Sequence, residues 1–254
     1  MDSTTFNSEV GSGTFSVATF NATVSKISDC LPDFNTKVEE VASAVAQLLT
    51  NPLIRGWIAD KVNWAMQKIR EAVTALFNKV TELLQGYVAP LLMFSREQSW
   101  SHDVYAPMQD LKVAVAEDQL IDQDSWDGEG YRAYKKAVKD QSEAAESVGN
   151  IGNSMHNNLS NCAIAGGVFY VAVLGVVIDT VVELTAAAGV SATGAGAPVG
   201  LAGTALSLGK ALGLLVALVG AVGAFLFAQQ QFINNMLNAL DSFPGNQWPN
   251  ATKG

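Results

Sequence analysis

The chain has 254 residues, which is long enough to bury a substantial core of its own. Its formal net charge of −9 argues against a nucleic-acid-binding protein, because neutralising phosphates requires a basic face. Only 15% of the residues are charged, against about 25% in a typical soluble domain. From residue 147 onward the charged side chains are Asp179, Glu183, Lys210, Asp241 and Lys253. The second half of the sequence therefore resembles membrane or buried-core material.

The first 33 residues lack the basic and apolar regions of a secretory signal peptide. We expect them to form a flexible leader, either poorly structured or with a short helix, that is closed by Pro32. Thr36 and Glu39 then match the capping box that begins many helices. We expect a protein that is secreted, or associated with the cell envelope or membrane, without a classical signal peptide.

The helical bundle expected over 34–160 contains the clearest periodicity of the chain. Its apolar residues alternate steps of four and three, as in the a/d stripe of a left-handed bundle. This seam consists of Val62, Met66, Ile69, Val73, Leu76, Val80 and Leu83. It is expected to pack inside the chain, with an intermolecular coiled coil as the alternative.

A polar turn that contains Trp126-Asp127-Gly128 separates two amphipathic stretches and predicts a helical hairpin over 95–159. Gly128 can adopt a positive φ, which lets the chain reverse sharply. The indole of Trp126 can close the end of the hairpin or dock into a partner. The plain alternative is that Trp126 is a core residue of the turn.

Gly130 supplies a small residue after this motif, and Tyr134 supplies an aromatic one. With them the turn resembles the W-x-G family of type VII secretion substrates, the early secretory antigen-like proteins. The resemblance implies a helix-turn-helix unit that pairs as a homo- or heterodimer, embedded in a longer helical rod in PPE- and EspB-type relatives. The family's export signal, Tyr-x-x-x-Asp/Glu, is missing, because Tyr131 is followed by Lys135 and Tyr134 by Val138. Either a partner chain carries that signal or the protein is not exported.

A hydrophobic, glycine-rich helical hairpin is expected over 161–240. Its two uncharged runs, 162–178 and 211–228, each approach the roughly 20 residues that span a bilayer. Small residues at four-residue steps in the second run are expected to let helices pack closely in lipid; they are Gly213, Ala217, Gly220, Ala221 and Ala224. The hairpin could be transmembrane, stored in a soluble form and released into membrane, or permanently buried.

Asp179 and Glu183 lie one helical turn apart at the end of the first run. Carboxylates within a membrane are costly and usually face water or a partner. In an assembly of several chains they would form an acidic ring that favours cations.

The sequence offers little material for catalysis or cofactor binding. His102 and His156 lack the spacing of the H-E-x-x-H zinc motif, and no phosphate-binding loop is present. Cys30 and Cys162 lie too far apart to indicate a disulfide framework or a metal site. We therefore expect no enzymatic activity, no metal and no cofactor.

These patterns together predict an all-α fold, with an elongated helical bundle, a W-x-G helix-turn-helix, a C-terminal hydrophobic hairpin and a polar tail over 241–254. The expected function is that of a non-enzymatic, type VII secretion-associated protein. It would pair with a helical protein partner or with itself, and engage membrane lipid through the hairpin. The alternatives are a helical pore-forming protein whose hairpin inserts into target membranes, and an integral membrane scaffold.

Overall fold

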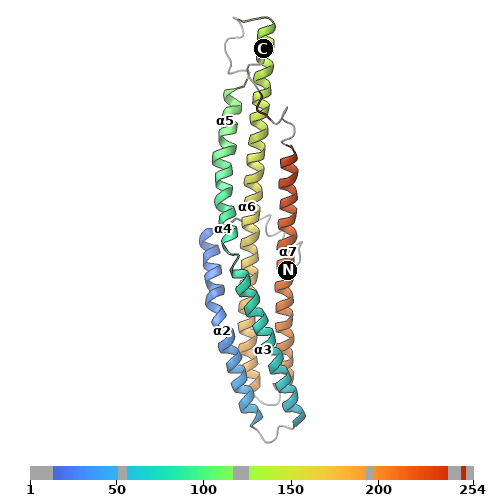
Figure 1. The fold of residues 1–254 in the computed structure, drawn as a ribbon. Helices are drawn as coiled ribbons and strands as arrows, with labels where there is room; N and C mark the ends of the chain where they lie inside the picture. The colour runs from blue at the N-terminus through green and yellow to red at the C-terminus, as the bar shows by residue number, and fades with distance from the viewer. Residues whose placement is uncertain (1–13, 51–55, 117–125, 193–196, 240–246, 250–254) are drawn as a thin grey trace. The chain divides into compact units, whose positions relative to one another are not determined.

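The structure, a computed structural model, describes residues 14–50, 56–116, 126–192, 197–239 and 247–249. These residues form helices and no strand, which confirms the predicted all-α class (Figure 1). In chain order the helices are α2 (Val17–Leu49), α3 (Gly56–Leu84), α4 (Val88–Ser99), the π-helical η1 (Trp100–Tyr105), α5 (Ala106–Ala114), α6 (Glu129–Ala192) and α7 (Ala197–Ala239).

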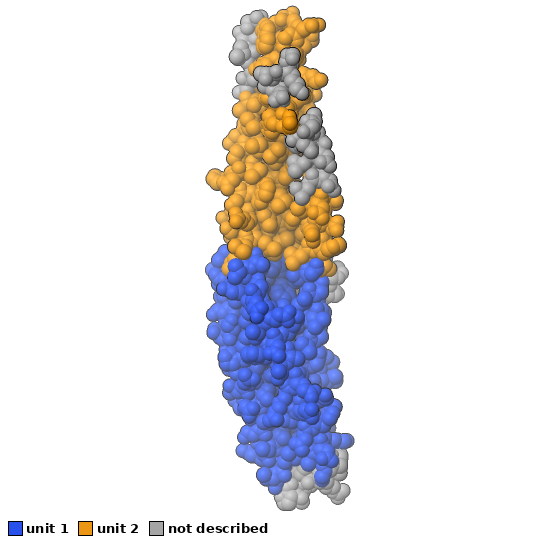
Figure 2. Space-filling view, viewed as in Figure 1, with its two compact units in different colours: residues 1–90, 164–223 blue, residues 91–163, 224–254 orange. Residues whose placement is uncertain are grey.

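The chain divides into two compact units (Figure 2). Unit 1 comprises residues 1–90 and 164–223, and unit 2 comprises residues 91–163 and 224–254. The long helices α6 and α7 each contribute residues to both units. The units therefore divide the chain differently from the domains predicted at 34–160 and 161–240.

In unit 1, α2 and α3 pack against each other through apolar stripes (Figure 1). The predicted seam supplies the α3 stripe, which is buried from Val62 to Val80, while Leu83 at its end is only half-buried. The stripe on α2 consists of Phe20, Ile27, Leu31, Phe34, Val38, Val41, Val45 and Leu48. Burying each large apolar side chain contributes about 1.5–3 kcal/mol. The seam is therefore used inside the chain and is not an exposed surface for a coiled-coil partner.

The flexible leader predicted over 1–33 is wrong for its described part. Helix α2 begins at Val17, where the Ser16 hydroxyl accepts a hydrogen bond from the Thr19 amide at 3.3 Å, and it continues through Pro32 to Leu49. Pro32 lacks an N–H and so removes one hydrogen bond from the helix. The buried stripe nevertheless continues in register on both sides of it, through Leu31 and Phe34. Burial across the proline therefore maintains the helix.

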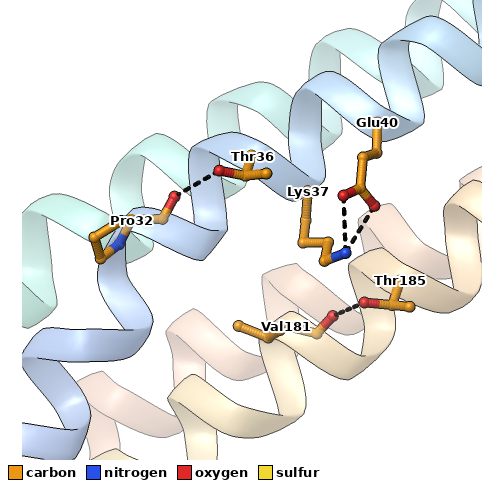
Figure 3. A network of polar contacts seen from close by, with 6 residues as sticks. All are labelled: Pro32, Thr36, Lys37, Glu40, Val181 and Thr185. Atoms are coloured by element: carbon orange, nitrogen blue, oxygen red, sulfur yellow. Dashed lines mark hydrogen bonds and ion pairs between the residues drawn. The ribbon is translucent and has the colours of Figure 1, made fainter.

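The capping box predicted at Thr36 is wrong for the same reason. Thr36 lies in the interior of α2, and its hydroxyl donates to the carbonyl of Pro32, one turn earlier, at 3.3 Å (Figure 3). Thr185 on α6 makes the same kind of bond to the carbonyl of Val181 at 2.8 Å. A threonine inside a helix can satisfy its hydroxyl in this way without beginning a helix.

The outward face of α3 carries polar side chains, as a solvated helix should. Lys68 pairs with Glu71 at 2.7 Å, and Lys79 pairs with Glu82 at 3.0 Å. Hydrogen bonds from Lys68 and Gln67 lower the pKa of the Glu71 carboxyl below its ordinary value. Such exposed pairs contribute little to stability, but they identify this face as one that meets water.

Candidate functional site: the apolar hairpin and the W-x-G turn

Helix α7 is apolar on both its buried and its outward faces. In unit 1 it packs through a stripe of buried leucines, which are Leu201, Leu208, Leu215 and Leu218. Its outward surface presents Val199, Leu206 and Val216 at 80%, 63% and 59% exposure. Only 11% of its most apolar stretch is buried, against 50% for α6. A helix that is apolar all round is ordinarily covered by protein or by lipid.

Both α6 and α7 are long and apolar enough to cross a membrane. The uncharged run 162–178 of α6 rises about 25 Å and the run 211–228 of α7 about 27 Å, at roughly 1.5 Å per residue. The hydrocarbon core of a bilayer is about 30 Å thick. Their lengths therefore suit a membrane crossing with little mismatch.

The small residues of α7 do not form its contact face within this chain. Gly213, Ala217, Gly220 and Ala224 are exposed, and Ala221 is half-buried. A Cβ atom added at Gly213 or Gly220 would meet no heavy atom of the described part of the chain within 4 Å. The buried leucines make the packing contacts instead, because their larger side chains reach across the interface. Close helix approach through the small residues therefore remains a prediction for contacts outside this chain.

One end of the apolar runs carries a polar groove in unit 1. Asp179 follows the run of α6 directly, and Lys210 directly precedes the run of α7. Asp179, Glu183 and Lys210 line the same groove of about 430 Å³, and the Ser207 hydroxyl donates to Glu183 Oε1 at 3.4 Å. Thr180, Leu208, Ala211, Leu214, Val176 and Val182 complete the lining.

The sequence predicted that Asp179 and Glu183 share one face of α6, and both line this groove. It did not predict that Lys210 faces the same space. The signal was nevertheless present, because an antiparallel hairpin places the start of its second run opposite the end of its first. The groove therefore carries both acidic and basic side chains rather than acidic ones alone.

At the other end of the runs, in unit 2, the boundary is polar but uncharged. Asn158 of α6 is buried, and its side-chain N–H donates to the carbonyl of Gln229 on α7 at 3.4 Å. The thiol of Cys162 lies 3.8 Å from Asn158 Oδ1. The apolar runs are thus bounded by polar groups at both ends.

The first apolar run is held within unit 1 by close contacts with α2 and with the α3–α4 junction. The phenol of Tyr170 donates to the carbonyl of Leu83 at 2.6 Å, and its ring meets Phe20 edge-on at 5.3 Å. Pro90 lies against Gly166 so closely that an added Cβ would fall 2.7 Å from Pro90 Cβ. This run is therefore better covered than that of α7.

The W-x-G turn directly precedes α6 in unit 2. Gly128 has φ +105°, the positive value that the sequence predicted, and its N–H donates to Asp127 Oδ1 at 2.6 Å. The Trp126 ring lies 5.3 Å from the Tyr134 ring, and a Cβ added at Gly130 would fall 3.7 Å from the indole. The residues of the motif therefore form one cluster. Trp126 remains 46% exposed, so part of its surface is available for a contact.

The helices on either side of this turn pair in an antiparallel way within unit 2. Lys112 of α5 pairs with Glu146 of α6 at 2.7 Å. Further from the turn, Gly152 of α6 approaches the backbone of Tyr105, where a Cβ atom would fall 3.1 Å from the Tyr105 nitrogen. The contact partners of later residues in α6 lie earlier in the chain before the turn. This is the antiparallel order of the predicted hairpin.

A buried carboxylate lies deeper in the same unit. Glu97 of α4 is 8% exposed, and its Oε1 lies 3.1 Å from Nδ1 of His156 on α6. The second oxygen, Oε2, is buried and has no hydrogen-bond partner among the residues that the structure describes. Sequence reasoning missed this pair, because nothing local links two residues so far apart in the chain.

Comparison with known proteins adds no assignment. No family model matches the chain, and no curated protein or solved structure matches it. The resemblance to the W-x-G family therefore stays an expectation drawn from the residues of the turn.

Proposed function

We propose that this protein is a non-enzymatic, type VII secretion-associated helical protein that engages membrane through the α6–α7 hairpin. The exposed apolar surface of α7 carries the proposal, because only 11% of its most apolar stretch is buried. Removing a large apolar side chain from water contributes about 1.5–3 kcal/mol. Leu206, Val216 and Phe227, each about 60% exposed, would contribute part of that amount on entering lipid.

The W-x-G turn supports the association with a secretion partner. Trp126 is packed on Tyr131 and Tyr134 yet remains half-exposed at the start of α6. A rigid aromatic side chain with one free face is a common anchor in protein interfaces. We propose that a helical partner, or a second copy of this chain, covers that face.

A pore-forming protein is the second candidate, and the cover over α6 favours it. The run 162–178 is half-buried, and Tyr170 and Gly166 contact the α3–α4 junction closely. Such contacts suit a hairpin that is stored in a soluble form and later released. The integral membrane scaffold differs from both, because its hairpin would never be stored in this way.

Cell fractionation tests the secretion part of the proposal. Producing cells are separated into cytosol, membrane and filtered supernatant, with and without the secretion ATPase, for the wild type and Trp126→Arg. Supernatant protein that is lost in both the ATPase deletion and Trp126→Arg supports the proposal. Trp64→Arg, at an exposed tryptophan of α3, is the matched control and should be exported. Protein that stays in the membrane pellet regardless of both changes contradicts secretion.

Liposome flotation and leakage test the membrane part with purified full-length protein. Val216→Asp and Phe227→Asp should reduce flotation, because each introduces a charge on the exposed face of α7. Val113→Asp, at an exposed valine of α5, should float like the wild type. Dye leakage from the liposomes supports the pore-forming candidate. The absence of leakage at every pH and lipid composition tested would rule that candidate out.

A further inference from the structure

The groove at the end of the apolar runs brings opposite charges to one space without pairing them. Asp179 and Glu183 on α6, and Lys210 on α7, all line it. None of the three takes part in an ion pair among the described residues. The volume of about 430 Å³ falls within the roughly 300–1,000 Å³ of ligand pockets. The groove therefore leaves room for a ligand that carries both charges.

The groove lies where the apolar runs end, which is where a hairpin that crosses a membrane would meet lipid headgroups. Asp179 directly follows the first apolar run and Lys210 directly precedes the second, so both lie where the hairpin would leave the hydrocarbon. Two of the apolar side chains that line the groove are exposed, Val182 at 61% and Leu214 at 37%. A lipid could therefore place its charged headgroup in the groove and its chains along exposed side chains of the hairpin.

The side chains that line the groove favour one of the two common zwitterionic headgroups, phosphocholine and phosphoethanolamine, over the other. Quaternary ammonium groups such as choline are typically held by aromatic side chains, and the described residues that line this groove include no aromatic one. A primary ammonium has three N–H donors, which carboxylates accept in strong charge-assisted hydrogen bonds. Asp179 and Glu183, one turn apart, suit such a group.

We propose that the groove binds the phosphoethanolamine headgroup of a membrane lipid. Lys210 contacts the phosphate, and Asp179 and Glu183 contact the ammonium. This inference rests on the proposed membrane function and names the lipid chemistry that the hairpin recognises.

The test uses purified full-length protein and two kinds of probe. The first is a set of vesicles of phosphatidylcholine alone, with added phosphatidylethanolamine, or with added phosphatidylglycerol. The second is soluble glycerophosphoethanolamine, glycerophosphocholine or glycerol phosphate, followed by NMR chemical shifts. The variants are Lys210→Gln, Lys210→Arg and the double variant Asp179→Asn/Glu183→Gln. Lys139→Gln, on an exposed part of α6 in unit 2, is the matched control.

The wild type should bind vesicles that contain phosphatidylethanolamine about tenfold more tightly than the other two kinds, as expected for one or two charge-assisted hydrogen bonds. Lys210→Gln and the double variant should lose this preference and the shifts caused by glycerophosphoethanolamine. Lys210→Arg and Lys139→Gln should keep both.

Two other results would overturn the inference. Equal binding of all three vesicle kinds by every variant would remove headgroup recognition and leave the membrane proposal intact. A preference for phosphatidylglycerol that depends on Lys210 alone would mean that the carboxylates take no part. Failure to bind any vesicle would contradict the membrane proposal instead. The titration with glycerophosphoethanolamine would then test headgroup binding by itself: chemical shifts that depend on Lys210 would support it, and their absence would contradict it.

Discussion

The phenolic O–H of Tyr170 donates to the backbone carbonyl of Leu83 at 2.6 Å, which joins the first apolar run of α6 to the last turn of α3 in unit 1. The same carbonyl accepts the backbone N–H of Gly86 at 3.1 Å, so the phenol is a second donor to an oxygen that has two lone pairs. The Tyr170 ring also packs edge-on against Phe20 of α2. One side chain of the apolar hairpin thus contacts two other helices of unit 1.

Replacing Tyr170 with Phe should lower the free energy of unfolding by about 1 kcal/mol, because the hydrogen bond is lost while the ring packing is kept. Urea unfolding measures the change. Tyr131→Phe, for which no hydrogen bond of the phenol is recorded among the described residues, is the control and should leave the midpoint unchanged. An unchanged midpoint for Tyr170→Phe would mean that the bond to Leu83 contributes nothing. If the protein forms pores, the same variant should also accelerate dye leakage.

Gly166→Ala should destabilise unit 1, because the new methyl group would lie 2.7 Å from Pro90 Cβ. Overpacking of this kind costs about 1–3 kcal/mol. Gly175→Ala in the same helix is the control, since nothing lies within 4 Å of an added Cβ there. Because Gly is a poor helix former, that control should gain about 0.5–1 kcal/mol. Thermal unfolding followed by circular dichroism compares the two, and equal midpoints would contradict the close contact.

Gly128→Ala should weaken the start of α6, because φ at this position is +105°. A left-handed backbone costs a residue with a side chain about 1–2 kcal/mol. Hydrogen exchange of the first amides of α6 measures the effect. Gly130→Ala, which would meet only ordinary contact with Trp126 at 3.7 Å, is expected to change exchange little. Similar exchange in the two variants would show that the turn tolerates a side chain at Gly128.

His156→Ala should lower the free energy of unfolding by about 2 kcal/mol, because it leaves the buried Glu97 carboxylate without its nearest partner. Guanidinium unfolding followed by circular dichroism measures the loss. The double variant His156→Ala/Glu97→Leu should recover part of it, because it removes the buried carboxyl group that has lost its partner. His102→Ala, at the exposed histidine of η1, is the control. A loss no greater than that of His102→Ala would mean that Glu97 is satisfied in another way.

Local patterns identified several elements of this protein correctly. The four-and-three spacing from Val62 to Val80 predicted a bundle helix, and those positions form the buried face of α3. Gly128 was predicted to take a positive φ from its place in a polar turn, and it does. Both predictions depend on neighbours within about one or two helical turns, which is the range over which spacing carries information.

The errors arose where a local signal was outweighed by packing. Pro32 and Thr36 suggested a helix boundary, yet the stripe from Phe20 to Leu48 continues across them. The same spacing rule, applied without stopping at Pro32, would have found that stripe. The small residues of α7 are a separate case, because close packing through them in lipid stays a prediction; within this chain Leu208 and Leu215 are the buried residues.

The sequence by itself determined the all-α class, the core-facing stripe of α3, the turn at Gly128 and the apolar length of the last two helices. Each depends on residue type and spacing along a single element. Only the tertiary structure decided that Lys210 shares a groove with Asp179 and Glu183, that Tyr170 bonds to Leu83, and that Glu97 is buried beside His156. These relationships join residues far apart in the chain, and the packing of helices, which no local pattern encodes, sets the distance between them.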